Sequence, residues 1–243
     1  MFNRNCLSYW FPRIEAAGLP VPRTLIVRTS LDLSEILDGE EPTGWAKLIR
    51  DLREAINEIG LPCFLRTGQT SNKHDWTRSC FLTDMTLLGQ HVYKLIEFSA
   101  CCDIIGLPTN VWAVRELIQT KPLFTAFRGF PVTREFRVFA EDGRVHCVHP
   151  YFPANSIEGG YPSDLDWRAK LEAASQMDTD PLARLCWLAM RASRALPGAW
   201  SIDLLEDAHG SWWITDAADA GCSFHWQGCE NEKRWPRLEW TDA

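Results

Sequence analysis

The chain has 243 residues, of which 46% are hydrophobic and 23% charged, a composition typical of a folded globular protein and not of a disordered one. Its formal net charge of −7 is spread over both halves, so it lacks a broad basic surface and we expect no extended nucleic-acid partner. No apolar stretch approaches the ~20 residues that span a bilayer, so we expect no membrane partner.

The cysteines and the N-terminal segment bear on the compartment. There are nine cysteines, and the first residues contain neither a continuous apolar region nor a small-residue cleavage site. We therefore expect no secretory signal, reduced thiols and a cytoplasmic location. The nearest metal-ligand spacing joins Cys222, His225 and Cys229, without a second pair of the CxxC type. A zinc-containing interaction domain built on these three residues is an alternative that stays open.

The first half of the chain predicts short strands and two helices. The proline-bounded segment GLPVPRTLIVRT favours an extended strand at Thr24–Arg28. Apolar residues spaced i, i+3, i+4, i+7 predict an amphipathic helix over 45–59, which Gly60 and Pro62 end. We expect further strands at 63–66 and 79–82, and a second helix from about 85 to 100.

The second half is dominated by paired strands, expected at 112–118, 134–141, 144–149, 200–206 and 211–216. Asp142-Gly143 lies between two alternating polar and apolar segments, which predicts a β-hairpin. Asp180 and Pro181 predict the start of a helix that runs to about Leu196. Antiparallel hairpins with helices on one face indicate the α+β class.

The polar loop after the strand at 63–66 is the first candidate binding element. Arg66 ends that strand, and Lys73 lies within the following segment TGQTSNKHDWTR. Small residues let backbone N–H groups fold over phosphates, and the two cations would neutralise phosphate charge. We expect this loop to close over a phosphate ligand, with Lys73 having no obvious partner nearby in sequence. A solvated loop with incidental charges is the alternative.

The predicted strand at 134–141 carries the second candidate group. The two-residue period of a strand places Glu135 and Arg137 on one face, and Arg134 with Phe136 on the other. In a cleft, the planar guanidinium of Arg137 would bind phosphate oxygens. An ordinary surface ion pair between Glu135 and Arg137 is the alternative.

The last predicted hairpin carries two aspartates. Asp203 lies inside an apolar strand, and Asp216 ends the partner strand. A buried aspartate is unfavourable unless it is paired or metal-bound. Carboxylates that converge across a hairpin supply the hard oxygen ligands that Mg²⁺ takes together with substrate phosphates. We therefore favour a magnesium site over a purely structural role for Asp203 and Asp216.

The order of these elements along the chain resembles the ATP-grasp superfamily over roughly residues 60–226. LRTGQTSNKHDW resembles its first phosphate-binding strand and mobile loop, and VRELI resembles the linker that holds adenine. REFRVFAEDGRV is similar to its arginine hairpin, and SIDLL with WWITDA to its magnesium hairpin. The resemblance implies two α+β subdomains that grip a nucleotide between antiparallel sheets. It divides the chain into a short N-terminal segment at 1–44, a first subdomain at 45–115 and a second at 116–243.

The resemblance also implies a set of site residues. ATP and Mg²⁺ would be the cofactors, with Lys73 and Arg137 acting on the transferred phosphate and Asp203 and Asp216 holding the metal. The residues that would contact the nucleotide are Arg66, Lys73, Arg115, Glu116, Leu117, Ile118 and Arg137. The family usually ends its magnesium hairpin Asp/Glu–x–Asn, whereas this chain has Asp216-Ala217-Ala218, with Asp219 as the nearest substitute.

The activity implied is that of an ATP- and Mg²⁺-dependent ligase. A carboxylate would be activated as an acylphosphate and attacked by an amine or a similar nucleophile, so the partners would be ATP and an unidentified carboxylate or a protein or peptide acceptor. Within the superfamily, the chain is similar to the cell-division-cycle proteins that assist assembly of a translation initiation factor. The likeness rests on Lys73, Asp75 and Trp76 and on the EFR segment at Glu135–Arg137. An ATP-binding assembly factor without ligase activity is therefore the other alternative.

Overall fold

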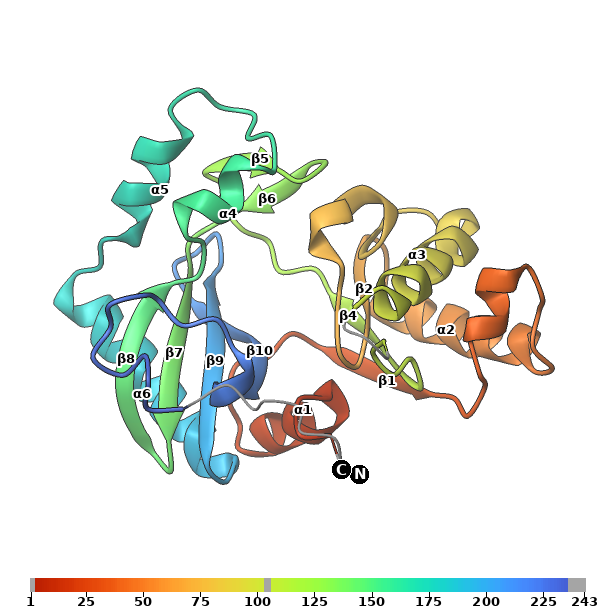
Figure 1. The fold of residues 1–243 in the computed structure, drawn as a ribbon, viewed down its shortest axis with the longest axis horizontal. Coiled ribbons are helices and arrows are strands. Elements are labelled where there is room, and N and C mark those ends of the chain that lie inside the picture. The colour runs from red at the N-terminus through yellow and green to blue at the C-terminus, as the bar shows by residue number, and fades with distance from the viewer. Residues whose placement is uncertain (1–2, 103–105, 236–243) are drawn as a thin grey trace.

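In the computed structural model, which describes residues 3–102 and 106–235, two four-stranded antiparallel sheets form two lobes that face each other (Figure 1). The first lobe contains β1 (Thr24–Arg28), β2 (Cys63–Thr67), β3 (Phe81–Leu82) and β4 (Val111–Glu116), in the order β1-β4-β2-β3. Helices α2 (Trp45–Ile59) and α3 (Leu88–Ala100) pack on one face of this sheet. Their apolar stripes and the sheet bury a core that includes Leu52, Leu65, Leu95 and Trp112.

The second lobe is built on the sheet β10-β9-β7-β8. Its strands are β7 (Glu135–Glu141), β8 (Arg144–Pro150), β9 (Ala199–Glu206) and β10 (Trp212–Asp219). Helix α6 (Thr179–Ala195) covers one face, and α1 (Leu7–Ala16) packs beside it, so that Trp10, Phe11, Trp200 and Leu188 share one core. The opposite face of the sheet contacts the cavity and residues 223–235, which follow β10.

A smaller layer lies above the second sheet in Figure 1. It consists of the hairpin β5 (Phe124–Ala126) and β6 (Phe130–Val132), with helices α4 (Ala154–Glu158) and α5 (Trp167–Ser175). Its core includes Trp76, which comes from the first lobe. Short 3₁₀ helices occur at Ser34–Asp38, Lys73–Arg78, Met85–Leu87 and Ala220–Cys222. In the part of the chain that the structure describes, no helix is both long and apolar enough to cross a bilayer.

The structure confirms several predicted elements and corrects others. The strand at Thr24–Arg28 and the helix at Trp45–Ile59 have the predicted bounds, and a hairpin forms around Asp142-Gly143. Helix α6 begins at Thr179, with Asp178 and not Asp180 as its N-cap residue, because Asp178 is the last residue with extended backbone angles. Pro181 is tolerated in the first turn, where backbone N–H groups lack intrahelical acceptors.

The N-terminal 44 residues contribute to both lobes. β1 pairs with β4 through the register Thr24↔Arg115, so it completes the first sheet. Helix α1, which the sequence did not predict, packs instead against the core of the second lobe. Pro12 lies inside this helix, and a proline there normally argues against a helix because it removes a backbone hydrogen bond. Burial of Leu7, Trp10 and Ile14 nevertheless stabilises the helix.

Candidate active site

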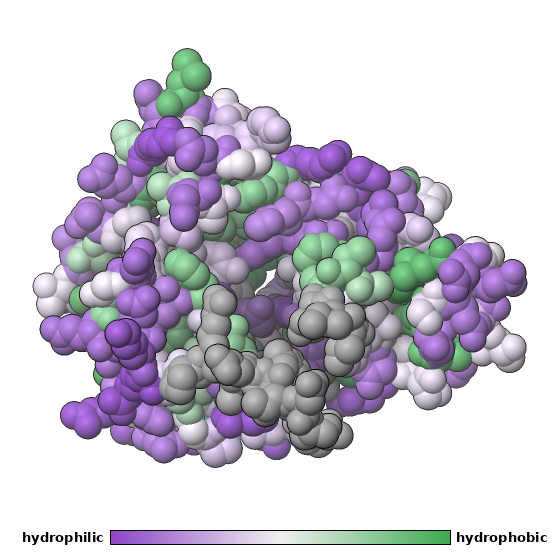
Figure 2. Space-filling view, viewed as in Figure 1, coloured by the Kyte–Doolittle hydropathy of each residue, from purple (hydrophilic) through white to green (hydrophobic). Residues whose placement is uncertain are grey.

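A cavity of about 340 Å³ lies between the two lobes, within the size range of small-molecule sites. Both sheets line it, together with the loop at 69–74 and the connection that follows β4. Figure 2 shows this opening between the lobes, with hydrophilic residues in its depth. The walls of the cavity therefore come from segments that are distant in sequence and that only the tertiary fold brings together.

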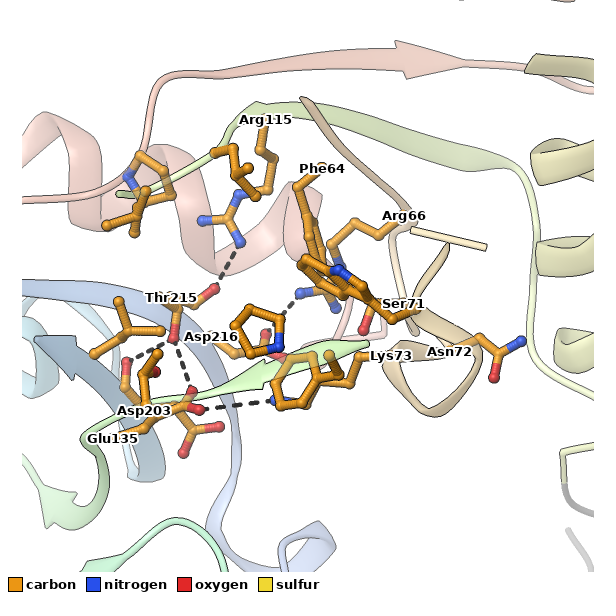
Figure 3. A pocket seen from close by; sticks show the side chains of 18 of the residues that line it. Phe64, Arg66, Ser71, Asn72, Lys73, Arg115, Glu135, Asp203, Thr215 and Asp216 are labelled. Atoms are coloured by element: carbon orange, nitrogen blue, oxygen red, sulfur yellow. Dashed lines mark hydrogen bonds and ion pairs between the residues drawn. The ribbon is translucent and has the colours of Figure 1, made fainter. Parts of the chain in front are cut away.

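The first sheet presents cations to the cavity because of strand alternation. On β2, Cys63 and Leu65 point toward α2 and α3, so Phe64 and Arg66 point the other way. Arg115 on β4 is the register partner of Phe64 and faces the cavity as well (Figure 3). Arg66 and Arg115 are each only 4% exposed, so two guanidinium groups are buried at this wall.

The second sheet presents carboxylates. As predicted, Glu135 and Arg137 share one face of β7, while Arg134 lies on the other and pairs with Glu206 at 3.2 Å. Arg137 is the register partner of Asp203 on β9, and Asp203 is in turn the partner of Asp216 on β10. The ladder thus places three charged side chains side by side across three strands.

Arg137 and Asp203 form a bidentate pair. Arg137 Nε donates to Asp203 Oδ1 at 2.8 Å, and Nη2 donates to Oδ2 at 2.9 Å. Burial alone would lower the pKa of Arg137, but the Asp203 carboxylate outweighs that effect and raises it above its ordinary value. Arg137 is not among the residues that line the cavity; it lies beside Asp203, which does.

Lys73 has partners that come from the opposite lobe. Its Nζ lies 3.9 Å from Glu135 Oε2 and 4.0 Å from the ring centroid of Tyr151, the residue that follows β8. Burial would lower the pKa of Lys73, but Glu135 and then Tyr151 outweigh it and raise that pKa. For Glu135, burial is the dominant effect, and with a smaller contribution from Asp203 it raises the carboxyl pKa to about 7 against the opposing effect of Lys73.

The two buried arginines also reach across the cavity. Arg66 Nη1 lies 3.2 Å from Asp216 Oδ1, and Arg115 Nη1 donates to the Thr215 carbonyl at 2.7 Å. Among the residues that the structure describes, buried Arg115 Nη2 has no hydrogen-bond partner, although the rings of Trp10 and Phe11 lie about 6 Å from its Cζ. Burial, and next the neighbouring Arg66, lowers the pKa of Arg115 to about 9. This wall would therefore be stabilised by an anion.

The loop that carries Lys73 is docked on the other lobe. Residues Lys73–Arg78 form a 3₁₀ helix, and His74 stacks on Phe127 with ring centroids 4.1 Å apart. Trp76 packs against Phe81 of the first lobe and Phe130 of β6. The sequence offered Lys73 no neighbouring partner, and the structure supplies Glu135 and Tyr151 from elsewhere in the chain.

Apolar side chains also line the cavity. The predicted strand at 112–118 ends at Glu116, so Leu117 and Ile118 belong to the connection between the lobes. Glu116 Oε1 accepts a hydrogen bond from the Arg23 amide at 2.7 Å, which joins the start of this connection to the residue that precedes β1. Leu117 and Ile118 line the cavity together with Phe64, Phe98 and Leu205.

The structure gathers most of the predicted site residues at this one cavity, namely Arg66, Lys73, Arg115, Glu116, Leu117, Ile118, Asp203 and Asp216. Asp219 does not join them, because it lies 3.4 Å from Arg4 and accepts a hydrogen bond from the Gly221 amide. Glu135 and Tyr151 line the cavity but were not predicted from the sequence to do so. For Glu135 a signal existed, since it shares a strand face with Arg137, whereas nothing in the sequence places Tyr151 beside Lys73.

Comparison with known proteins supports the fold. No protein-family model and no curated protein matches the sequence. An ADP complex of N5-carboxyaminoimidazole ribonucleotide synthetase is similar, with a TM-score of 0.51 and 14% identity over 88% of this chain and 44% of that chain. D-alanine–D-alanine ligase from Bacillus anthracis with ATP is similar at a TM-score of 0.51 and 9% identity, over 88% and 54% of the two chains. The chain spans about half the length of each of these two structures, and the predicted α+β architecture, with antiparallel sheets that match ATP-grasp structures, is confirmed.

Proposed function

We propose that the chain binds Mg·ATP in this cavity and acts as an ATP-dependent ligase that activates a carboxylate. One observation carries the proposal. Cations from the first lobe, Arg66 and Lys73, meet carboxylates from the second lobe, Asp203 and Asp216, in a single cavity that apolar side chains also line. A magnesium-bound nucleotide has the same division into phosphate charge, hard cation and apolar ring.

The residues fit such a ligand by their chemistry. Arg66 and Lys73 would bind phosphate oxygens, and Asp203 and Asp216 would hold magnesium through carboxylate oxygens. Leu117 and Ile118, which line the cavity, would contact the adenine ring. Bound magnesium neutralises charge on the phosphate oxygens and orients them for transfer.

Nucleotide binding would exchange the present ion pairs for new ones. Arg66 now contacts Asp216, and Lys73 lies near Glu135, so each cation faces a carboxylate of the other lobe. Phosphates would bind the two cations, and the metal would bind Asp216, which Arg66 releases, together with Asp203. Glu135, which Lys73 would release, has a carboxyl pKa raised to about 7 by burial, so it can bind a proton and need not remain in the interior as an isolated charge.

The chemistry requires no nucleophile from the protein. An oxygen of the substrate carboxylate attacks the γ-phosphorus, ADP leaves, and an amine then displaces phosphate from the acylphosphate. The role of this chain's residues is to position the reactants and to stabilise negative charge on the transferred group, with Lys73 as the proposed catalytic cation and Arg137, predicted from the sequence in the same role, as a positioning residue. Arg137 would hold Asp203 in position through two hydrogen bonds, and its positive charge would lie near the cavity.

Calorimetric titration with Mg·ATP tests the binding step. We expect saturable binding by the parent and an affinity lower by roughly tenfold to a hundredfold in Lys73→Ala, since a charge-assisted contact is lost. Lys47→Ala is the matched control, because Lys47 pairs with Asp51 on the outer helix α2. Absence of binding by the parent, or equal loss in both lysine variants, would contradict the proposal. ATP-dependent phosphate release that rises with added carboxylate and amine, together with the ligated product by mass spectrometry, tests the ligase step.

A second candidate, an ATP-binding assembly factor without ligase activity, is favoured by the closing residues of β10. Ala218 stands where the ATP-grasp pattern has an asparagine, and Asp219 is engaged by Arg4 and the Gly221 amide. The likeness of Lys73, Asp75 and Trp76, and of the EFR segment, to the cell-division-cycle assembly proteins supports the same candidate. Tight Mg·ATP binding with no acceptor-dependent phosphate release would favour this candidate over the ligase.

A further inference from the structure

Four metal-ligating side chains converge on the second sheet, beside Arg137, which is the register partner of His149. They are Cys147 and His149 of β8, and His225 and Cys229 of the segment that follows β10. One ligand atom from each lies within 4.8 Å of all the others. His225 Nε2 is 3.1 Å from His149 Nε2 and 3.2 Å from Cys147 Sγ.

The backbone explains why these side chains meet. Cys147 and His149 are two residues apart on one strand, so they point from the same face of the sheet. The segment after β10 crosses that face, and His225 stacks on Phe139, the register partner of Cys147, with ring centroids 4.1 Å apart. Trp226 Nε1 donates to the Pro150 carbonyl at 2.9 Å, which anchors the turn that leads to Cys229.

The turn itself places the fourth side chain. Gly228 has a φ of +81°, a conformation that favours glycine, and the Cys229 amide donates to the Trp226 carbonyl at 3.3 Å. His225 and Cys229 are thereby directed at the same point from one turn, as Cys147 and His149 are from one strand. Structural zinc sites commonly join two short ligand pairs separated by a long stretch of chain, although the one-residue gap between Cys147 and His149 is shorter than their usual gap of about two to four residues.

Two of the distances between ligand atoms approach those around a tetrahedral zinc ion. Zn–S bonds of about 2.3 Å and Zn–N bonds of about 2.0–2.1 Å set neighbouring ligand atoms roughly 3.3–3.8 Å apart. The two nitrogen atoms at 3.1 Å and the nitrogen–sulfur pair at 3.2 Å lie close to those edges. All nine cysteines are free, so no disulfide uses Cys147 or Cys229.

We propose that Cys147, His149, His225 and Cys229 bind one Zn²⁺ in a closed, structural Cys₂His₂ site. Two thiolates and two imidazoles are the donor set that zinc prefers, and four protein ligands leave no position for a substrate. Binding releases the two thiol protons, and both imidazoles coordinate through Nε2 as neutral rings. The spacing Cys222, His225 and Cys229 considered from the sequence is corrected, because Cys222 is exposed and lies outside this cluster.

The site has a structural consequence for the cavity. Residues 223–235 form neither helix nor strand, so few backbone contacts hold them on the sheet. The same segment covers Arg137, whose Nη1 donates to the Phe224 carbonyl at 3.4 Å while its other nitrogens hold Asp203. Zinc would fix the segment one residue away from this contact and so position Arg137.

Metal analysis of the full chain, purified under reducing conditions without added metal chelator, tests the site. We expect about one zinc per chain in the parent and in Cys222→Ser, the matched control from the same segment. Zinc should fall to background in Cys147→Ser and in His225→Gln. Zinc that persists in both cluster variants, or that is lost with Cys222→Ser, would overturn the proposal.

A measurement on the unaltered chain keeps the test independent of whether the variants fold. After removal of metal with a chelator, titration with Co²⁺ under reducing conditions should give the intense visible bands of tetrahedral cobalt together with thiolate charge-transfer absorption, saturating at about one equivalent. Excess Zn²⁺ should abolish those bands. A parent chain without zinc and without this spectrum, or one holding a Cys147–Cys229 disulfide, would refute the site, whatever the outcome of nucleotide binding.

Discussion

The bidentate pair between Arg137 and Asp203 allows a quantitative test of how the second sheet holds its charges. Asp203→Asn keeps the size of the side chain and removes its charge. The carboxylate now accepts hydrogen bonds from two guanidinium nitrogens at 2.8 and 2.9 Å, whereas an amide offers only one acceptor oxygen. Because Asp203 is only 4% exposed, water cannot readily take its place, and Arg137 is left without its counter-charge.

The expected loss of stability follows from burial. Removing one partner of a buried ion pair costs about 3–5 kcal/mol. The side chain of Arg137 is 18% exposed and its Cζ lies 4.9 Å from the Tyr151 ring centroid, so we expect the lower end, about 3 kcal/mol. For a chain of this length that lowers Tm by roughly 6–12 °C. In Asp216→Asn the loss should be about 1 kcal/mol, because the Asp216 side chain is 43% exposed.

Urea unfolding followed by tryptophan fluorescence supplies the free energies. The set comprises the parent, the two aspartate variants, Arg137→Gln and the double variant Arg137→Gln with Asp203→Asn. The double variant has no unpaired charge, so it should be more stable than the sum of the single effects predicts, by about 2 kcal/mol. Equal losses in the two aspartate variants, or strictly additive effects, would refute this reasoning. Saturating Mg·ATP, which at a hundredfold excess over Kd adds about 2.7 kcal/mol, should stabilise the parent but neither aspartate variant.

Two further predictions concern Glu135 and Gly68. The pKa of Glu135 is raised to about 7 in the fold, so the folded state binds its proton more tightly than the unfolded chain does. The stabilising effect of this proton is complete below the unfolded pKa and is lost as the pH rises through about 7. In parallel urea titrations between pH 4 and 8, the free energy of unfolding of the parent should fall by about 3 kcal/mol relative to that of Glu135→Gln. A difference between the two proteins that stays constant with pH would contradict this. Gly68→Ala should destabilise by about 1–3 kcal/mol, because its Cβ would lie 2.6 Å from Cys6 Sγ and 2.9 Å from Val111 Cβ; unchanged unfolding midpoints would show that the strand end can shift.

Local elements follow from local signals. The helix at Trp45–Ile59 was predicted with its bounds because its apolar residues repeat at the helical period and Gly60 ends it. The hairpin around Asp142-Gly143 was predicted because the turn requires positive φ values, which the structure shows at both residues. Helix α1 was missed, since the proline inside it argues against a helix, and only burial against the second lobe stabilises it.

The candidate site divides in the same way. Alternation along β7 determined that Glu135 and Arg137 share a face, and the chain order of charged hairpins indicated the fold. Which charges pair was decided by the closure of the two lobes, which brings Lys73 to Glu135 and Tyr151.

The cysteine and histidine cluster depends still more on the tertiary structure. Cys147 and His225 are 78 positions apart, and the two ligand pairs match no common short spacing in the sequence. A segment without regular structure has no periodicity that could reveal where it docks. The sequence alone determined the strand face on which Cys147 and His149 lie, and the packing of His225 on Phe139 decided what they meet there.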